Sequence, residues 1–501
     1  MIIDARTIDH NSTIEADICI VGSGPAGMTL AMELADFDGT ICLLEAGGEE
    51  MAQEHQHLYA GNEKGLSRFG YLQTCRLRMF GGTSNFWAGY CAPLHPFDFE
   101  KKDWIEHSGW PINYQDIEPF YHRAQSILQL DEYNYDVNYW RPDDAKRKPF
   151  DGPMFHTTMW QRKDLSFAKA YKQRINDQSN LSTYLYANVT KIALHDSAQH
   201  VTHLDVATLT GRKLTVSAKY VILACGGIEC VRLLLASNDI MRNGIGNNYD
   251  RVGRFFMDHP HTRGALQILL SEDDTHSMTR ERRQNDQRET LTCPNIMASP
   301  EYQRKERILN AAYTIRQRNS KLDPMTKSVA DLARAMDGIT SPVPSAVSWL
   351  YGFHEQAPNP DSRLYLGDDK DTLGMPRLTL DWQVNALDRH SLKSTLHLFA
   401  KALGVTGKGR GLIEEWVAAD EPWTRGQFFS HAHHMGTTRM HDDPTLGVTD
   451  KNCKIHGVDN LFIASCSVFP TGGWANPTLS IVAFAVRIAD HIKEIHSIEP
   501  K

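Results

Sequence analysis

The sequence lacks the features that mark several large classes of protein. Its nine cysteines are scattered and contain no C-x-x-C pair, so neither a disulfide framework nor a zinc or iron–sulfur ligand set is predicted. No stretch offers about 18 uninterrupted apolar residues, and residues 1–15 lack the basic start and apolar core of a secretory signal. We therefore expect no membrane span, no metal site and a cytoplasmic protein with reduced thiols.

An excess of positive charge is also missing. The formal net charge is −8, so the chain has no general attraction to phosphate backbones, and nucleic acid is not an expected partner. One arginine-rich run, "TRERRQNDQR" at 279–288, is predicted to be a solvated loop. The composition is that of an ordinary globular protein, and a length of 501 residues predicts at least two lobes.

A nucleotide-binding pattern occupies the N-terminal region. From Ala16 the text "ADICIVGSGPAGMTLAMELADFDGTICLLEAGG" predicts a strand, a helix and a second strand. The G-x-G-x-x-G motif at Gly22, Gly24 and Gly27 would bring a pyrophosphate close to the helix N-terminus. Glu45 ends the second strand, where its carboxylate can accept the ribose hydroxyls. These features predict an adenine dinucleotide, and Pro25 with "LLEAGG" resembles FAD sites more than NAD sites.

Three further segments are candidates for the rest of the cofactor site. A strand-rich region closes with "YVILACGG" and places Val189 where its backbone can meet the adenine, although plain sheet structure explains it equally well. In "RLRMFGGTSNFWAGYCAP", glycines permit close approach of a flat ligand and small polar groups can bind its edge. The candidate contacts in that segment are Gly81, Gly82, Thr83, Ser84, Asn85 and Trp87.

The C-terminal tail predicts a strand, "NLFIAS", followed by a turn and a helix. Pro477 suits the first helical position, which makes Asn476 the expected N-cap and Thr478 part of the first turn. The positive end of this helix would stabilise the negative charge of a reduced flavin.

Three histidines in four positions stand in "HAHHMGTTRM": His431, His433 and His434. Their spacing alone leaves a metal site, a patch of buried rings and proton chemistry open. An imidazole suits alcohol oxidation, because its unperturbed pKa lies near neutrality and the reaction must remove a hydroxyl proton.

Taken together, these motifs resemble the glucose–methanol–choline (GMC) oxidoreductases, and the resemblance covers most of the chain. It rests on the segments above together with "LACGGIECVRLLL", "VGRFFMDHP" and "GVTDKNCKIHGVDNLFIASCSVFPTGGWANPTLSI". The tail with "ANPTLS" is similar to pyranose oxidases and related sugar dehydrogenases. The resemblance implies hydride transfer from a carbinol carbon to flavin N5 while a histidine takes the hydroxyl proton. It assigns the catalytic pair to His433 and Asn476, not to His431 or His434.

Two departures from the family pattern bear on the cofactor. Some pyranose oxidases attach their flavin through a histidine in the segment where this chain has Phe86, so we expect FAD to bind non-covalently. Family members often have an acid at the position of Ser465, which can still offer a weaker hydrogen bond to the flavin's ribityl chain.

The expected fold is α/β, with a Rossmann-like FAD-binding lobe and an interleaved α+β substrate lobe built on an antiparallel sheet. The FAD lobe is predicted to comprise 1–65, 165–260 and 425–501; the substrate lobe and its cap segments comprise 66–164 and 261–424. Within the latter, "WLYGFHEQAPNPDSRLYLGDD" predicts a strand, a Pro-rich turn and a strand. His354 and Gln356 are candidates to bind substrate hydroxyls, although simple surface exposure would equally explain them.

The sequence thus predicts an FAD-dependent oxidoreductase that oxidises a CH–OH group of a sugar, glycoside or polyol. Its partners would be a small alcohol or carbohydrate and an electron acceptor such as oxygen or a quinone; the oligomeric state stays open. A flavin-containing hydroxynitrile lyase and a nicotinamide-dependent dehydrogenase are the alternatives.

Overall fold

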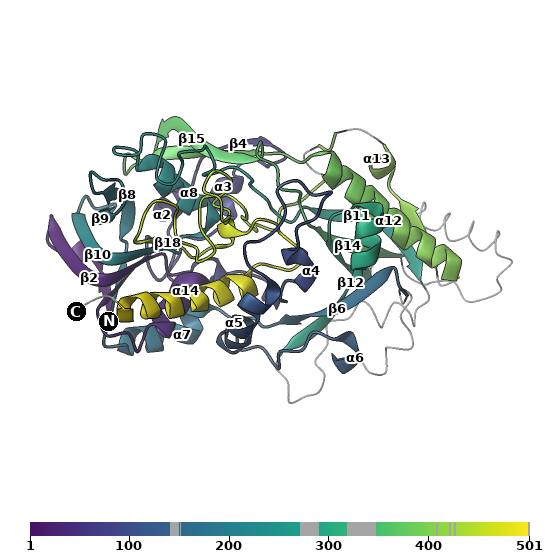
Figure 1. The fold of residues 1–501 in the computed structure, drawn as a ribbon, viewed down its shortest axis with the longest axis horizontal. Helices are drawn as coiled ribbons and strands as arrows, with labels where there is room; N and C mark the ends of the chain where they lie inside the picture. The colour runs from purple at the N-terminus through teal and green to yellow at the C-terminus, as the bar shows by residue number, and fades with distance from the viewer. Residues whose placement is uncertain are drawn as a thin grey trace.

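The computed structural model describes residues 1–140, 150, 152–270, 290–317, 347–406, 409–419, 422–424 and 427–498. The arginine-rich run at 279–288 lies outside these residues. Two lobes stand side by side along the long axis, each built on its own sheet, and both chain termini lie at the outer end of the first lobe (Figure 1).

The first lobe is built on a mainly parallel sheet. Strand β2 (Ser12–Val21) leads through helix α1 (Pro25–Glu33) to β3 (Ile41–Leu44), and β2 pairs in parallel with both β3 and β10 (Lys213–Leu223). All four residues of β3 are buried, as expected for a strand covered on both faces. The strand order is β1-β7-β3-β2-β10-β9-β8, and β18 pairs with β10. The remaining strands are β1 (Ile2–Asp4), β7 (Leu181–Leu185), β8 (Asn188–Leu194), β9 (Val201–Ala207) and β18 (Leu461–Ile463).

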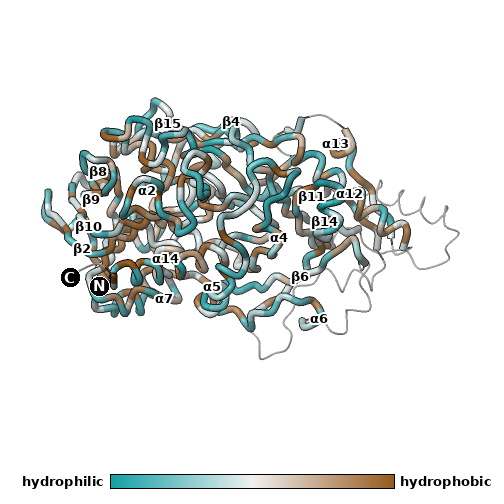
Figure 2. Tube along the Cα trace, in the orientation of Figure 1, coloured by the Kyte–Doolittle hydropathy of each residue, from teal (hydrophilic) through white to brown (hydrophobic). Residues whose placement is uncertain are grey.

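Apolar helices cover this sheet. Helix α14 (Thr478–Ile498) packs on α1 and on α5 (Tyr114–Ile127). The tube in Figure 2 is brown along α14 and the neighbouring strands, which marks the core of the first lobe. Helices α7 (Phe167–Asp177) and α8 (Gly226–Ala236) complete the lobe. The predicted strand–helix–strand unit, the strand at "YVILACGG" and the C-terminal helix are therefore confirmed.

The second lobe is built on a seven-stranded sheet of order β17-β11-β14-β13-β12-β6-β5, in which every neighbouring pair is antiparallel. Helix α12 (Ala386–Thr406) packs on β11 and β17, and its buried Phe399 joins Tyr313 and Leu350 in a second core. The strands are β5 (Tyr90–Cys91), β6 (Phe155–Arg162), β11 (His261–Leu270), β12 (Leu291–Ala298), β13 (Ala311–Gln317), β14 (Val347–His354) and β17 (Gly409–Ile413). The predicted antiparallel sheet is confirmed.

A small third sheet packs against helix α8 of the first lobe. In it β16 (Pro376–Trp382) pairs antiparallel with β15 (Arg363–Lys370) and parallel with β4 (Asn62–Gly65). Strand β4, at the end of the first range expected for the FAD lobe, thus pairs with a strand from the range expected for the substrate lobe. The short helices are α2 (Gln53–His57), α3 (Tyr71–Thr74), α4 (Pro96–Phe99), α6 (Val137–Trp140), α10 (Pro300–Glu306) and α13 (Glu415–Ala418). Across the described ranges, no helix is long and apolar enough to cross a bilayer.

Candidate active site

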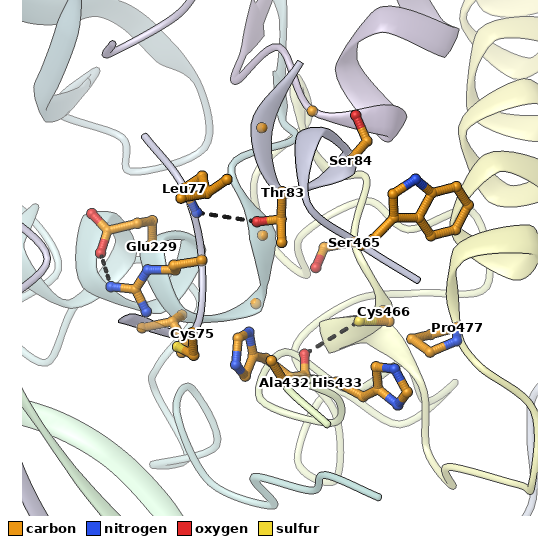
Figure 3. Close-up of a pocket in the computed structure, with 18 of the residues that line it drawn as sticks. Cys75, Leu77, Thr83, Ser84, Glu229, Ala432, His433, Ser465, Cys466 and Pro477 are labelled. Carbon is orange, nitrogen blue, oxygen red and sulfur yellow. Dashed lines mark hydrogen bonds and ion pairs between the residues drawn. The ribbon is translucent and has the colours of Figure 1, made fainter. Parts of the chain in front are cut away.

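One cavity of about 1210 Å³ runs from the glycine turn after β2 to a group of histidines and aromatic rings from the segment 428–434 and from strands β11 and β14 of the second lobe. Figure 3 shows its central part, with Thr83 and Ser84 on one side and Ala432, His433 and Pro477 on the other. Residues far apart in the sequence therefore line one cavity.

The turn between β2 and α1 has the geometry that a pyrophosphate requires. Gly22 has a φ of +103°, in a region that disfavours residues with a Cβ, and a Cβ on Gly27 would lie 1.8 Å from the carbonyl oxygen of Gly22. A Cβ on Gly24 would meet no atom within 4 Å, so only open cavity lies beside it. Gly22 and Gly27 thus shape the turn, while Gly24 leaves room for a ligand.

Glu45 is held firmly beside this turn. Its Oε2 accepts hydrogen bonds from the Ser23 backbone N–H (3.1 Å) and hydroxyl (2.6 Å), and its Oε1 accepts one from the Gly47 N–H (2.8 Å). Burial raises the pKa of the carboxyl, and these hydrogen bonds oppose the rise. The carboxylate lines the cavity with lone pairs left for ribose hydroxyls.

The segment 81–87 packs against the same turn. The Gly81 N–H donates to the Ser23 hydroxyl (3.2 Å), and a Cβ on Gly82 would lie 3.1 Å from the Cα of Gly24. Gly82, Thr83, Ser84 and Trp87 line the cavity. Asn85 does not: its amide donates to the carbonyls of Phe80 and Gly82 and shapes the turn from behind. Gly81 likewise lies behind the lining and supports the turn.

Two buried arginines supply unused hydrogen-bond donors. Arg76 and Arg78 both pair with Glu229, at 2.9 Å and 3.1 Å, and both guanidinium groups lie over the ring of Tyr59. Even so, Nε and Nη1 of Arg76 and Nε of Arg78 have no partner among the described residues. Both side chains line the cavity. Free donors, a carboxylate with lone pairs left and a glycine turn together fit a dinucleotide carrying phosphates.

The start of helix α14 differs from the expectation by one residue. The first helical hydrogen bond runs from the Ile481 N–H to the Pro477 carbonyl (2.8 Å), which makes Pro477 the N-cap and Thr478 the first helical residue. Asn476 therefore does not cap the helix, and the N-cap prediction is wrong. Its amide donates to the Tyr90 carbonyl (3.3 Å), while its buried Oδ1 has no partner among the described residues. Asn476, Pro477 and Thr478 all line the cavity.

Ser465 also lines the cavity, at the end of β18. Its hydroxyl accepts a hydrogen bond from the Ser467 N–H (3.2 Å) and caps a short 3₁₀ turn at Cys466–Val468. Val189 lines the cavity from β8, as expected for a residue near the adenine.

His433 reaches the cavity through a bulge. Two antiparallel bridges, Met257–Met435 and His261–Phe429, clamp this region, and between them residues 258–260 lie opposite 430–434. The longer side bulges at Ala432, whose φ is +60°, and the Asp258 carboxylate accepts the His433 backbone N–H (3.0 Å). Burial, helped by the nearby imidazoles of His259 and His431, holds the pKa of His433 well below its usual range. The imidazole is therefore neutral near pH 7.

The two neighbouring histidines have different surroundings. His434 bonds the Tyr71 hydroxyl (3.0 Å), and burial lowers its pKa to about 3. His431 stacks on Phe353 with ring centroids 4.1 Å apart. All three imidazoles line the cavity. Within the described residues, no group of three or more His, Cys, Asp or Glu side chains is arranged to hold a metal ion.

His354 and Gln356 lie elsewhere than expected. Both are buried and neither lines the cavity. His354 bonds the Tyr313 and Thr262 hydroxyls, both at 3.2 Å. The amide oxygen of Gln356 accepts hydrogen bonds from the Asp258 N–H and the Trp382 indole, which ties the third sheet to the segment before β11. Their polar atoms bond other groups inside the protein, so neither side chain is placed to bind a substrate in the cavity. The alternative prediction, that both are exposed surface residues, is wrong because both are buried.

Aromatic rings form the rest of the cavity wall at this end. Next to His431, the cavity is lined by His261, Tyr351, Phe353, Trp382, Phe428 and Phe429. Such a wall binds flat or apolar faces of a small molecule, while the imidazoles offer polar contacts.

Several residues of this site are absent from the sequence prediction. Asp258 and His259 stand in the motif "VGRFFMDHP", and Arg76, Arg78 and Glu229 also stand in motifs used for the resemblance. These residues could have been predicted from their type, because a charged side chain inside an otherwise apolar motif is usually buried and paired with another group.

Comparisons with known proteins identify two domains in the chain. A family model described as "FAD dependent oxidoreductase" matches residues 17–242, and one described as "GMC oxidoreductase" matches residues 358–485. The fold and the site thus define a flavin-dependent oxidoreductase. The chain thus carries an FAD-dependent oxidoreductase domain followed by a GMC oxidoreductase C-terminal domain.

Its relatives are enzymes named for small hydroxylated substrates. The chain is 25% identical to a 2-methyl-1,2-propanediol dehydrogenase from Mycolicibacterium austroafricanum over 96% of each chain. It is 23% identical to the fructose dehydrogenase large subunit of Gluconobacter japonicus, over 96% of this chain and 98% of that one. The crystal structure of pyridoxine 4-oxidase from Mesorbium loti shares the fold, with a TM-score of 0.60 and 18% identity over 97% of this chain and 100% of that one.

Proposed function

We propose that the protein oxidises a CH–OH group of a sugar, glycoside or related polyol, with non-covalently bound FAD. The observation that carries this proposal is a neutral, half-buried imidazole, His433, which lines the same cavity as Asn476 and the glycine turn. The relatives named for a diol and for fructose support a hydroxylated substrate.

In this proposal His433 accepts the hydroxyl proton and Asn476 orients the substrate oxygen. The imidazole acts as a general base because it is neutral at physiological pH, and the amide can donate a hydrogen bond without competing for the proton. FAD supplies the hydride acceptor when bound. The second-lobe wall around Phe353 and Tyr351 excludes water and packs against the carbon skeleton of the substrate.

The cofactor contacts that we propose follow the lining of the cavity. Glu45 would bind the adenosine ribose, the turn at Gly22 and Gly24 the pyrophosphate, and Val189 the adenine. The segments around Gly82 and Ser465 would lie along the flavin end. We also propose the division into FAD lobe and substrate lobe given above, a cytoplasmic location, and reoxidation by oxygen, a quinone or another acceptor.

A single anaerobic screen tests the function. The purified yellow protein is mixed with sugars, glycosides, polyols and aromatic alcohols, and bleaching of the flavin absorbance is recorded. We expect rapid bleaching by at least one polyol or sugar. If only aromatic alcohols bleach the flavin, the substrate is an aromatic alcohol and not a sugar, glycoside or polyol. If no alcohol bleaches it but the protein cleaves a cyanohydrin, the protein is a lyase.

A further inference from the structure

The imidazole of His259 lies directly behind His433 and has two hydrogen-bonding partners. Its Nδ1 is 2.8 Å from Nδ1 of His433, and its Nε2 is 2.9 Å from the carbonyl oxygen of Gly473. His259 is fully buried and does not line the cavity. It can therefore influence a bound alcohol only through His433.

These two contacts define where the protons lie. A carbonyl oxygen only accepts, so Nε2 of His259 must carry the hydrogen that it donates to Gly473. Burial lowers the pKa of His259 to about 4, which leaves the ring neutral with a single N–H. Its Nδ1 is then an acceptor, and the hydrogen of the short contact belongs to Nδ1 of His433.

We propose that His259 is a positioning residue that holds His433 in the tautomer with its proton on Nδ1, so that the unprotonated Nε2 is the atom that accepts the alcohol proton. This proposal rests on the proposed function and extends it. In the step itself, the alcohol O–H bond breaks and the proton forms a bond to Nε2. The proton on Nδ1 stays in place, and the resulting imidazolium donates to His259.

The Gly473 peptide that anchors His259 is itself fixed. Its N–H donates to Oε1 of Glu355 (2.9 Å), and its φ is +58°. A Cβ at this position would lie 2.6 Å from the side chain of Leu94 and 3.0 Å from that of Asp98, so the position is shaped for glycine. The chain from Glu355 through Gly473 and His259 to His433 is thus continuous.

The nature of the partner sets the basicity of His433. A carboxylate behind the base would raise its pKa by stabilising the cation, as in serine hydrolases, whereas a neutral imidazole only accepts the hydrogen bond. Among the described residues, the carboxylate that bonds both histidines is that of Asp258, and it accepts hydrogen bonds from their backbone N–H groups, not from their rings. The other titratable groups near the pair are Tyr71, His261, His354, Glu355, His431 and His434.

Two substitutions at position 259 and a control at position 156 separate positioning from packing. His259→Phe keeps a ring but removes the acceptor, so anaerobic flavin reduction by the best alcohol should slow by about 10–100-fold. His259→Asn restores an acceptor near Nδ1 and should recover most of the rate. His156→Phe is the matched control, because His156 is a largely buried histidine whose ring contacts His95 outside the cavity. It should leave the rate unchanged.

A comparison of His259→Asn with His259→Asp gives a readout that packing does not affect. The two side chains have nearly the same shape, but the carboxylate stabilises the His433 imidazolium. The acid limb of the reduction rate against pH should therefore lie at least one pH unit higher in the Asp variant. Coincident acid limbs in the two variants would overturn the proposal, as would an Asn variant as slow as the Phe variant.

The tautomer can be measured without turnover. In protein labelled with ¹⁵N-histidine, two-bond ¹H–¹⁵N spectra should contain a signal from an Nδ1–H imidazole that disappears in His433→Ala. A signal of the Nε2–H form at His433 would disprove the tautomer assignment. If no alcohol bleaches the wild-type flavin, the proposed function fails while this measurement still decides the tautomer.

Discussion

At the scale of single residues, the bulge at 430–434 directs the His433 imidazole into the cavity. Replacement of His433 by Ala removes the base, so anaerobic flavin reduction should slow by about 10²–10⁴-fold while FAD stays bound. Stopped-flow absorbance, normalised to flavin content, measures this rate. His431→Ala and His434→Ala should slow the reaction much less. If flavin reduction is slow in His431→Ala or His434→Ala but as fast as the wild type in His433→Ala, then His431 or His434 is the base.

The carboxylate of Glu45 provides the second residue-scale prediction. Glu45→Arg places a cation beside the glycine turn and removes the acceptor of three hydrogen bonds, so FAD occupancy should fall sharply. Glu45→Gln keeps one acceptor oxygen and should retain part of the FAD. The ratio of flavin to protein absorbance measures occupancy in both variants. Equal occupancy would mean that Glu45 only shapes the strand end.

At the scale of elements, the segment 81–87 packs its glycines on the nucleotide turn and leaves Phe86 at the edge of the cavity, 74% exposed. A phenyl ring cannot form the histidyl bond that fixes flavin in some relatives. Precipitation with acid should therefore release all of the flavin as free FAD, which chromatography of the supernatant can identify. Yellow colour that stays with the precipitate would contradict this prediction and point to another attachment residue.

The local pattern of apolar and polar residues in the sequence was enough to predict some elements but not others. The strand–helix–strand unit around Gly22 and the antiparallel character of the second sheet were predictable, because each depends on residues close in sequence. The partners of His354 and Gln356 were not, since Tyr313 and Trp382 reach them only through tertiary pairing of strands. For the same reason the sequence identified His433 by resemblance but missed His259, which faces it across two backbone bridges.

At the scale of the whole molecule, buried neutral histidines make stability depend on pH. Burial lowers the pKa of His354 to about 3, against about 6.5 in an unfolded chain. Its contribution to stability is therefore complete above pH 6.5 and is lost as the pH falls towards 3. His354→Phe should destabilise the protein at pH 8, and the difference from the wild type should shrink by about 2 kcal/mol at pH 5. Urea unfolding of both proteins at equal FAD saturation measures this; a difference independent of pH would contradict it.

The place of the C-terminal tail in the first sheet has a consequence for how the protein is made. Strand β18 pairs with β10 beyond the end of β9, and α14 covers α1, so the sheet of residues 2–223 is complete only with residues 461–498. While a ribosome is still adding that tail, the nascent first lobe presents an unpaired strand edge and an uncovered apolar helix. The growing chain therefore needs protection from aggregation until residues 461–498 have left the ribosome, and the cavity, which residues 464–466 and 476–478 line, can close only then.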